Sequence, residues 1–223
     1  DQVVARARAM LQQADDIRGI AQLAKDPESG SIRLGLFPTL APYLLPHVVP
    51  AIHARFPHLE LLLVEEKTEV VMARLRSGEL DAGVLALPGG HEGLHMQPLF
   101  TEEFVLAVPT GHPLSHVQGT VSTSVLAGDN VLLLEEGHCL RDQTLSYCQP
   151  AERGSLSSFG ASSLTTIVQM VANGLGITVL PEVSLPFEVH DPRIALLRFP
   201  EPQPTRAVAL AWRRSSPRRH DFE

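Results

Sequence analysis

The sequence predicts an α/β fold, because short apolar strands alternate with helical patterns along most of its 223 residues. Apolar residues make up 44% of the chain, which is enough for an ordinary hydrophobic core. The length suits one large domain or two small ones. No internal repeat and no low-complexity tract interrupts the alternation.

The first expected element is a helix over residues 1–25, a segment that contains no proline and one glycine. Val3, Met10, Ile17 and Ala24 recur every seven residues, and alanines stand between them. This is a weak heptad pattern with small residues at the d positions. The spacing fits a helix that lies against a partner and an amphipathic helix that packs on its own domain equally well.

After the break at residues 27–30, strands and helices alternate. The expected strands are Ile32–Phe37, Leu59–Val64, Ala82–Leu87, Phe104–Val108, Val131–Leu134, Ile177–Leu180, Ala195–Phe199 and Val208–Trp212. The expected helices are Ala41–Arg55, Glu69–Arg76, Cys139–Cys148 and Ser163–Asn173. The first three strands and their two helices form a βαβαβ unit, which predicts a parallel sheet covered by helices.

Hydroxyl residues stand where several helices begin, after the carboxyl ends of strands. They are Thr39, Thr68 and the pair Ser162-Ser163. In open α/β sheets this edge binds ligands, and helix N-termini there offer free N–H groups to a small polar molecule. Plain helix N-capping explains the same residues.

The formal charge of −7 argues against binding of nucleic acid by this stretch itself. The one dense basic run, residues 213–219, is expected to be a solvated surface segment. No apolar run is long enough for a membrane span, and two cysteines are too few for a disulfide scaffold, which favours the cytosol. The chain opens with Asp1 and charged turns, so we expect a fragment of a longer protein without a signal peptide.

The two cysteines, Cys139 and Cys148, lie in one short predicted helix. Nine helical steps place their sulfurs roughly 13 Å apart, whereas a disulfide needs Cα atoms within about 7 Å. The pair can therefore bond only if the helix comes apart, as a redox switch requires. A closed loop of about ten residues gains roughly 3 kcal/mol from chain entropy, which is close to the expected cost of breaking the helix.

The residues around Cys139 have opposite effects on the stability of its thiolate form. A position at a helix N-terminus and the neighbouring His138 and Arg141 favour the thiolate, whereas Glu135 and Glu136 oppose it. A reactive thiol would form a sulfenic acid that the second cysteine condenses with. Two inert buried cysteines are the alternative. A zinc site is poorly supported by the C-x8-C spacing, and the C-x-x-C of thioredoxin-type catalysts is absent.

The segment Gly137–Gln143, with Cys148 nine residues after Cys139, closely resembles the redox centre of the hydrogen-peroxide-sensing LysR-type transcription regulators of bacteria. Residues 38–46, 78–81 and 174–181 resemble the regulatory domain of the same family. The likeness covers nearly the whole chain, and the cysteine segment is its most specific part.

The resemblance implies a periplasmic-binding-protein-like type 2 regulatory domain of two α/β subdomains joined by two crossover strands. Residues 1–26 would be the end of a linker and dimerisation helix. Residues 27–101 with 207–223 would form subdomain I, and residues 102–206 subdomain II with the redox cysteines. A winged helix-turn-helix DNA-binding domain would precede Asp1.

The resemblance also implies roles for individual residues. Cys139 would be the peroxidatic cysteine and Cys148 the resolving one. Thr39, Thr68 and His138 match positions around a peroxide pocket between the subdomains. Arg206 matches an arginine that stabilises the reduced thiolate.

The implied partners are hydrogen peroxide, a second copy of the chain (a tetramer in the full-length protein), promoter DNA, RNA polymerase and a glutaredoxin- or thioredoxin-type reductant. The protein would be a stoichiometric sensor in the bacterial cytoplasm and not an enzyme. No residue pattern calls for a metal or nucleotide cofactor. The main alternative is a LysR-type domain that binds a small organic effector and whose cysteines have no redox role. A solute-binding protein of the same fold and a peroxidase are two further alternatives.

Overall fold

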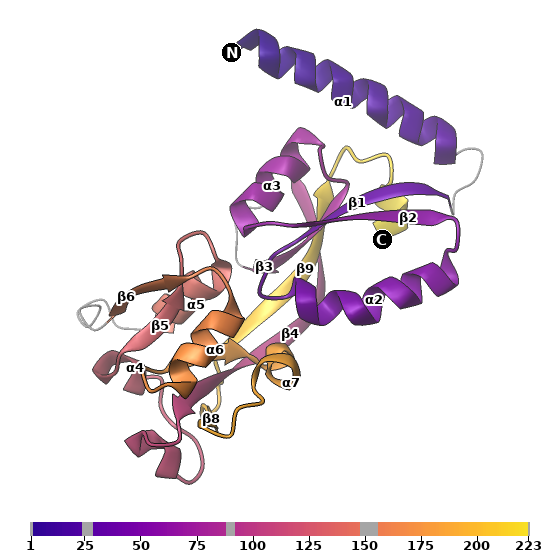
Figure 1. Cartoon of the computed structure of the whole chain (residues 1–223). Coiled ribbons are helices and arrows are strands. Elements are labelled where there is room, and N and C mark those ends of the chain that lie inside the picture. The colour runs from indigo at the N-terminus through magenta and orange to yellow at the C-terminus, as the bar shows by residue number, and fades with distance from the viewer. Residues whose placement is uncertain (1, 24–28, 88–91, 148–155, 223) are drawn as a thin grey trace. The chain divides into compact units, whose positions relative to one another are not determined.

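The structure is a computed structural model that describes residues 2–23, 29–87, 92–147 and 156–222 (Figure 1). The chain divides into two compact units, unit 1 (residues 1–100 and 207–223) and unit 2 (residues 101–206). The chain passes between the units twice, within strand β4 (Leu94–Pro109) and within strand β9 (Thr205–Arg213). These two strands therefore connect the units covalently.

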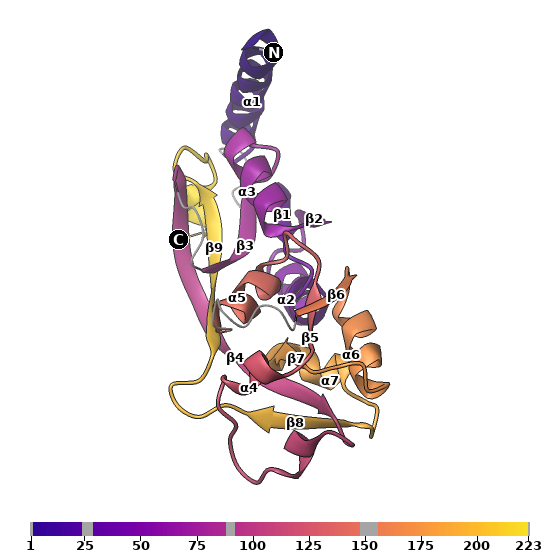
Figure 2. The same ribbon diagram turned by 90° about the vertical axis from the view of Figure 1, so that its left-hand side faces the viewer.

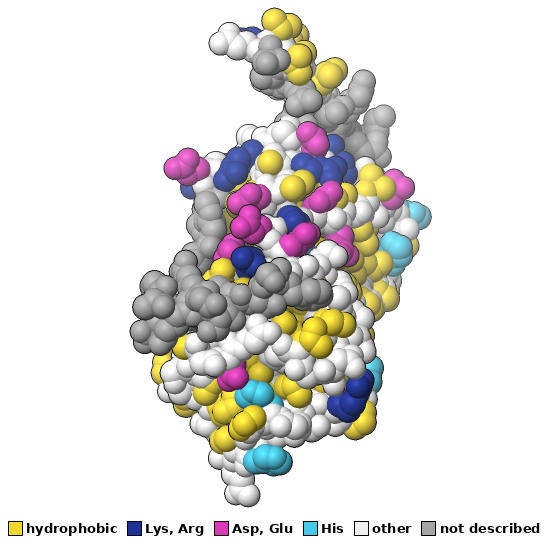
Figure 3. Space-filling model, turned by 60° about the vertical axis from the view of Figure 1, so that its left-hand side comes forward, with side chains coloured by type: hydrophobic (Ala, Val, Ile, Leu, Met, Phe, Trp, Pro, Cys, Tyr) yellow, Lys and Arg dark blue, Asp and Glu magenta, His cyan; other side chains and the backbone are white. Residues whose placement is uncertain are grey.

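Helix α1 (Gln2–Leu23) confirms the expected first helix. Its heptad residues Val3, Met10 and Ile17 are 80%, 70% and 67% exposed, so they do not pack on the rest of unit 1. Figure 3 shows apolar side chains on the surface of this helix, at the top of the view. Ala24, the next residue of the pattern, lies outside the described residues. The exposed apolar positions favour the interpretation as a helix that lies against a partner.

The sheet of unit 1 is built around β1 (Gly30–Leu36), which pairs in parallel with β2 (Leu59–Glu65) and β3 (Ala82–Leu87). Helices α2 (Ala41–Arg55) and α3 (Thr68–Ser77) connect these strands (Figure 1). The βαβαβ prediction is confirmed. The three strands of this unit are parallel, as expected, and β9 from the far end of the chain adds to the sheet by pairing with β3 in antiparallel fashion.

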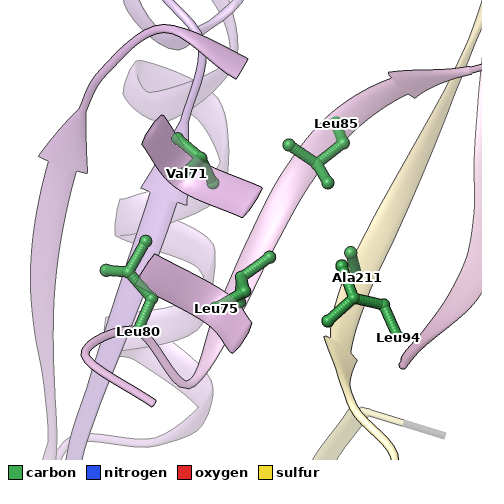
Figure 4. Close-up of a cluster of buried hydrophobic side chains, with 6 residues drawn as sticks. All are labelled: Val71, Leu75, Leu80, Leu85, Leu94 and Ala211. Carbon is green, nitrogen blue, oxygen red and sulfur yellow. The ribbon is translucent and has the colours of Figure 1, made fainter. Parts of the chain in front are cut away.

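One buried apolar cluster of unit 1 lies between α3 and the sheet. Figure 4 shows its six buried residues: Val71, Leu75, Leu80, Leu85, Leu94 and Ala211. The approach is close, since a Cβ atom on Gly35 of β1 would lie 2.6 Å from Leu80 Cδ1 and 2.8 Å from Val71 Cγ1. Dense packing of this kind tolerates added atoms poorly.

Unit 2 holds two groups of strands. The end of β4 pairs in antiparallel fashion with β7 (Thr178–Pro181) and β8 (Ile194–Arg198), while β5 (Val131–Leu134) and β6 (Leu156–Ala161) pair in parallel. Helices α5 (Cys139–Tyr147) and α6 (Leu164–Ala172) contact β5 (Figure 2). The shorter helices of the unit are η1 (Pro113–His116), α4 (Val125–Gly128), η3 (Glu182–Ser184) and α7 (Leu185–Glu188).

The C-terminal basic run, which ends in the short helix α8 (Arg219–Phe222), differs from the expectation of a solvated segment. Arg213 and Arg218 are buried. Arg218 donates from Nη2 to the Ser29 carbonyl oxygen at 2.8 Å and from Nη1 to Asp221 Oδ2 at 2.9 Å. These hydrogen bonds compensate the burial of the Arg218 guanidinium. They also attach the C-terminal segment to Ser29, the residue before β1. No helix among the described residues is long and apolar enough to cross a membrane.

Candidate functional site

Cys139 is the first residue of α5 and carries a free, partly exposed thiol. The chain reaches it from the buried strand β5 through a turn in which Gly137 has a φ of 89°. This left-handed conformation is easy for glycine and unfavourable for residues with a Cβ atom. The turn places Cys139 at the N-terminus of the helix, where the first backbone N–H groups have no acceptor within the helix.

Three contacts hold the beginning of α5 on the rest of unit 2. Leu140 is buried, and Arg141 donates from Nη1 to the carbonyl oxygen of Leu134 at 3.0 Å. The Arg141 backbone N–H also donates to His138 O at 3.0 Å. The Arg141 cation, which the sequence suggests as a neighbour of the thiol, therefore also anchors the helix to the end of β5.

His138 is buried, and its Nε2 atom lies 3.8 Å from Oε1 of Glu135. A positive charge on this imidazole would thus face a carboxylate as well as the start of α5. His138 and Glu135, for which the sequence indicates opposite effects on the Cys139 thiol, therefore lie close to each other just before α5.

Arg206 is buried at the point where β9 leaves unit 2, and its Nε donates to Oε1 of Glu102 at 2.6 Å. The Arg206 guanidinium also lies over the Phe104 ring, with Cζ 5.9 Å from the centroid. Sequence reasoning named Arg206 and missed Glu102. No local pattern distinguishes Glu102 from its neighbour Glu103, which is only partly buried, because the burial of Glu102 depends on Arg206, 104 residues further along the chain.

Thr39 and Thr68 belong to unit 1, whereas Cys139, His138 and Arg206 belong to unit 2. Thr39 is buried and precedes Leu40, the N-cap of α2. Thr68 follows Lys67, the N-cap of α3, and its Oγ1 is buried without a hydrogen-bond partner among the described residues. Neither residue is the N-cap of its helix. A pocket that combines these residues with those of unit 2 remains a prediction.

The third hydroxyl site behaves as a cap. Ser163 is the N-cap of α6, and its side chain accepts from the Thr166 N–H at 3.3 Å. Capping thus explains Ser163, whereas it does not explain Thr39 or Thr68, since neither of them is the N-cap of its helix. Cys148, the predicted resolving cysteine, lies outside the described residues. In the described part of the chain, no three His, Cys, Asp or Glu side chains are grouped to hold a metal ion.

The family model of the LysR substrate binding domain matches residues 25–223. A probable hydrogen peroxide-inducible genes activator of Mycobacterium avium is 42% identical over 218 residues, which is 97% of this chain and 70% of the relative. The DNA-binding transcriptional dual regulator OxyR of Escherichia coli (strain K12) is 39% identical over 221 residues, which is 99% of this chain and 72% of the relative.

Solved structures agree. A hydrogen-peroxide-bound OxyR mutant from Corynebacterium glutamicum superposes with a TM-score of 0.85 at 32% identity, covering 99% of this chain and 70% of that one. The reduced form of OxyR gives 0.78 at 40% identity, and the oxidised form 0.76 at 42%; each comparison covers 87% of this chain and 91% of that chain.

The chain therefore belongs to the LysR-type regulators, as a LysR substrate-binding domain. Within that family, its relatives and the similar structures place it in the OxyR group. The predicted fold class and the resemblance to peroxide-sensing regulators are confirmed.

Proposed function

We propose that this chain is the regulatory domain of a transcription regulator that senses hydrogen peroxide through Cys139. The observation that carries the proposal is a free thiol on the first residue of α5, partly exposed beside the helix N-terminus. The relatives named as hydrogen peroxide-inducible activators, and OxyR structures in reduced and oxidised forms, support it.

The chemistry has two balanced steps. The Cys139 thiolate attacks one peroxide oxygen, the O–O bond breaks, and the products are a sulfenic acid and hydroxide, which takes up a proton to become water. The Cys148 thiol then attacks the sulfenic sulfur, forming the disulfide and releasing a second water. Peroxide is reduced and the two thiols are oxidised, so the chain acts as a stoichiometric sensor until a glutaredoxin- or thioredoxin-type reductant restores it.

The threonines of unit 1 are proposed to bind peroxide. Both are hydroxyl residues near the starts of helices, and Thr68 Oγ1 is a buried polar atom with no hydrogen-bond partner among the described residues. A hydroxyl can donate to one peroxide oxygen and accept from the other. The buried Arg206 is proposed to stabilise the thiolate and the charge that develops on the leaving oxygen, with Glu102 fixing its position.

The oxidised domain is proposed to act through its oligomeric state. The exposed apolar positions of α1 fit a helix that pairs with a second copy of the chain. The DNA-binding domain that reads the promoter and recruits RNA polymerase would belong to the full-length protein in the cytoplasm. The E. coli relative, of which this chain covers 72%, is named as a DNA-binding regulator.

One equivalent of hydrogen peroxide added to the reduced chain tests the proposal, with free thiols counted and intact mass measured. The expected result is loss of both thiols and of two hydrogen atoms within seconds, with a Cys139–Cys148 peptide on digestion. Two thiols that persist for many minutes would contradict it. Thermal stabilisation by a small organic molecule without any peroxide response would then indicate an effector-binding domain.

A further inference from the structure

The last residue of α5, Tyr147, makes two contacts outside its helix. Its hydroxyl donates to the carbonyl oxygen of Thr205 at 3.2 Å. Its ring meets the fully buried Phe104 ring edge-on, with centroids 6.4 Å apart at 69°. The geometry is typical of a favourable aromatic pair, so the end of the helix is fastened by both a polar and an apolar contact.

Both contact partners lie on the strands that connect the units. Phe104 belongs to β4 and Thr205 to β9, each a few residues from the point where its strand passes into unit 1. Phe104 also lies under Arg206, which is paired with Glu102. Tyr147 thus joins the redox helix to a buried cluster on both connecting strands.

This contact belongs to the helical form of the segment, the form in which Cys139 has a free thiol. In that form eight helical steps separate Cys139 from Tyr147, a rise of about 12 Å. A disulfide between Cys139 and the residue after Tyr147 requires Cα atoms within about 7 Å. The helix must therefore unwind, and the direction of the Tyr147 side chain changes with it.

From these contacts we infer that Tyr147 is a positioning residue that holds the dithiol form of α5 against β4 and β9, and that disulfide formation releases it. The inference rests on the proposed function and adds the route by which the disulfide reaches the connecting strands. Burial raises the pKa of Tyr147, although the Thr205 carbonyl lowers it in part, so the phenol keeps its donor proton at neutral pH.

A contact made only in the dithiol form stabilises that form, so its removal makes the disulfide harder to reduce. A single hydrogen bond of ordinary net strength corresponds to roughly a 2- to 12-fold change in an equilibrium constant. Tyr147→Phe, which keeps the ring, should raise the disulfide/dithiol equilibrium constant against glutathione by that factor, and Tyr147→Leu should raise it further.

The matched control is Ser146→Ala. Ser146 is exposed, and its hydroxyl donates within α5, to the Gln143 carbonyl at 2.6 Å. Titration of the full chain against glutathione redox buffers, read by thiol alkylation and mass, should leave this variant at the wild-type equilibrium constant. In a Cys148→Ser background, the rate of sulfenic acid formation should be the same with and without the Tyr147→Phe substitution.

Equal equilibrium constants for wild type, Tyr147→Phe and Tyr147→Leu would overturn the inference, as would a shift toward easier reduction. A purely structural role would lower the unfolding midpoints of the reduced and oxidised chains equally and leave the equilibrium constant unchanged. The proposed function fails separately, because in that case the wild-type chain forms no peroxide-driven disulfide at all.

Discussion

Arg206 Nε donates to Glu102 Oε1 at 2.6 Å, and both side chains are buried in unit 2. Neighbouring Glu103 makes an ion pair of a different kind, with the half-exposed Arg198 at 2.7 Å. One unit therefore offers a buried and an exposed ion pair on adjacent residues, and the two can be compared by the same substitution.

Glu102→Ala should destabilise the chain by about 3–5 kcal/mol, because it breaks the buried ion pair between Glu102 and Arg206. Glu103→Ala, the matched control, should cost about 0–1 kcal/mol, since an exposed pair gains little over hydration. Urea unfolding of both variants measures the difference. Equal and small costs would mean that the Arg206 charge is compensated by other groups.

Gly176→Ala should destabilise unit 2 by about 1–3 kcal/mol, the range for overpacking. A Cβ atom there would lie 2.2 Å from the backbone oxygen of Asn130, which accepts from the Ile177 N–H at 3.0 Å. Gly111→Ala is the control, since its Cβ meets nothing within 4 Å and the change also restricts the unfolded chain. Thermal unfolding should separate the two; a neutral Gly176→Ala would contradict the close approach.

The sequence predicts much of this fold and of the redox helix, but it fails where burial does not follow a local pattern. The start of α5 at Cys139 and the strand Val131–Leu134 are confirmed. For β4 the apolar run at Phe104–Val108 was found, while the preceding residues from Leu94 were not. Most of these residues are exposed and show no alternation of apolar and polar side chains, so no local pattern predicts a strand there. They are extended because β4 pairs with the distant strand β9.

The sequence also does not predict which charged residues are buried, because their burial depends on partners that are distant in the chain. Arg213 and Arg218 look like surface residues in a basic run, and only the folded chain supplies Ser29 and Asp221 as partners of Arg218. Glu102 was likewise invisible without its partner, which lies 104 residues away. The sequence shows that these residues are charged, whereas their burial depends on long-range pairing.

Thr68→Val should slow oxidation of the reduced chain by roughly 10- to 100-fold, the loss of one hydrogen bond to a charged transition state. Stability should change little, because Thr68 Oγ1 has no hydrogen-bond partner to lose among the described residues. The second-order rate constant with peroxide, followed by stopped-flow thiol loss, checks this. Thr166→Val on α6 is the control; an unchanged rate in Thr68→Val would remove this threonine from the peroxide site.

The carboxyl of Asp191 should stay ionised at a lower pH than an ordinary aspartate. Hydrogen bonds from Arg193 lower the pKa of Asp191 from 3.8 to about 2. Since the folded-state pKa lies below the unfolded value, the pair contributes stability above pH 3.8 that is lost as the pH falls toward 2. A carboxyl-carbon NMR titration should show this midpoint, and Arg193→Gln should return it toward 3.8. An ordinary midpoint in the wild-type chain would contradict the pairing.

The most direct test of peroxide sensing assigns the two steps to the two cysteines. Cys139→Ser and Cys148→Ser are each mixed with peroxide in the presence of a sulfenic-acid trap, and trapped product is followed over time by mass. We expect Cys148→Ser to be trapped at Cys139 at the wild-type rate, while Cys139→Ser keeps its remaining thiol. If Cys139→Ser loses that thiol to equimolar peroxide as fast as the wild-type chain, then Cys139 is not the sensing residue.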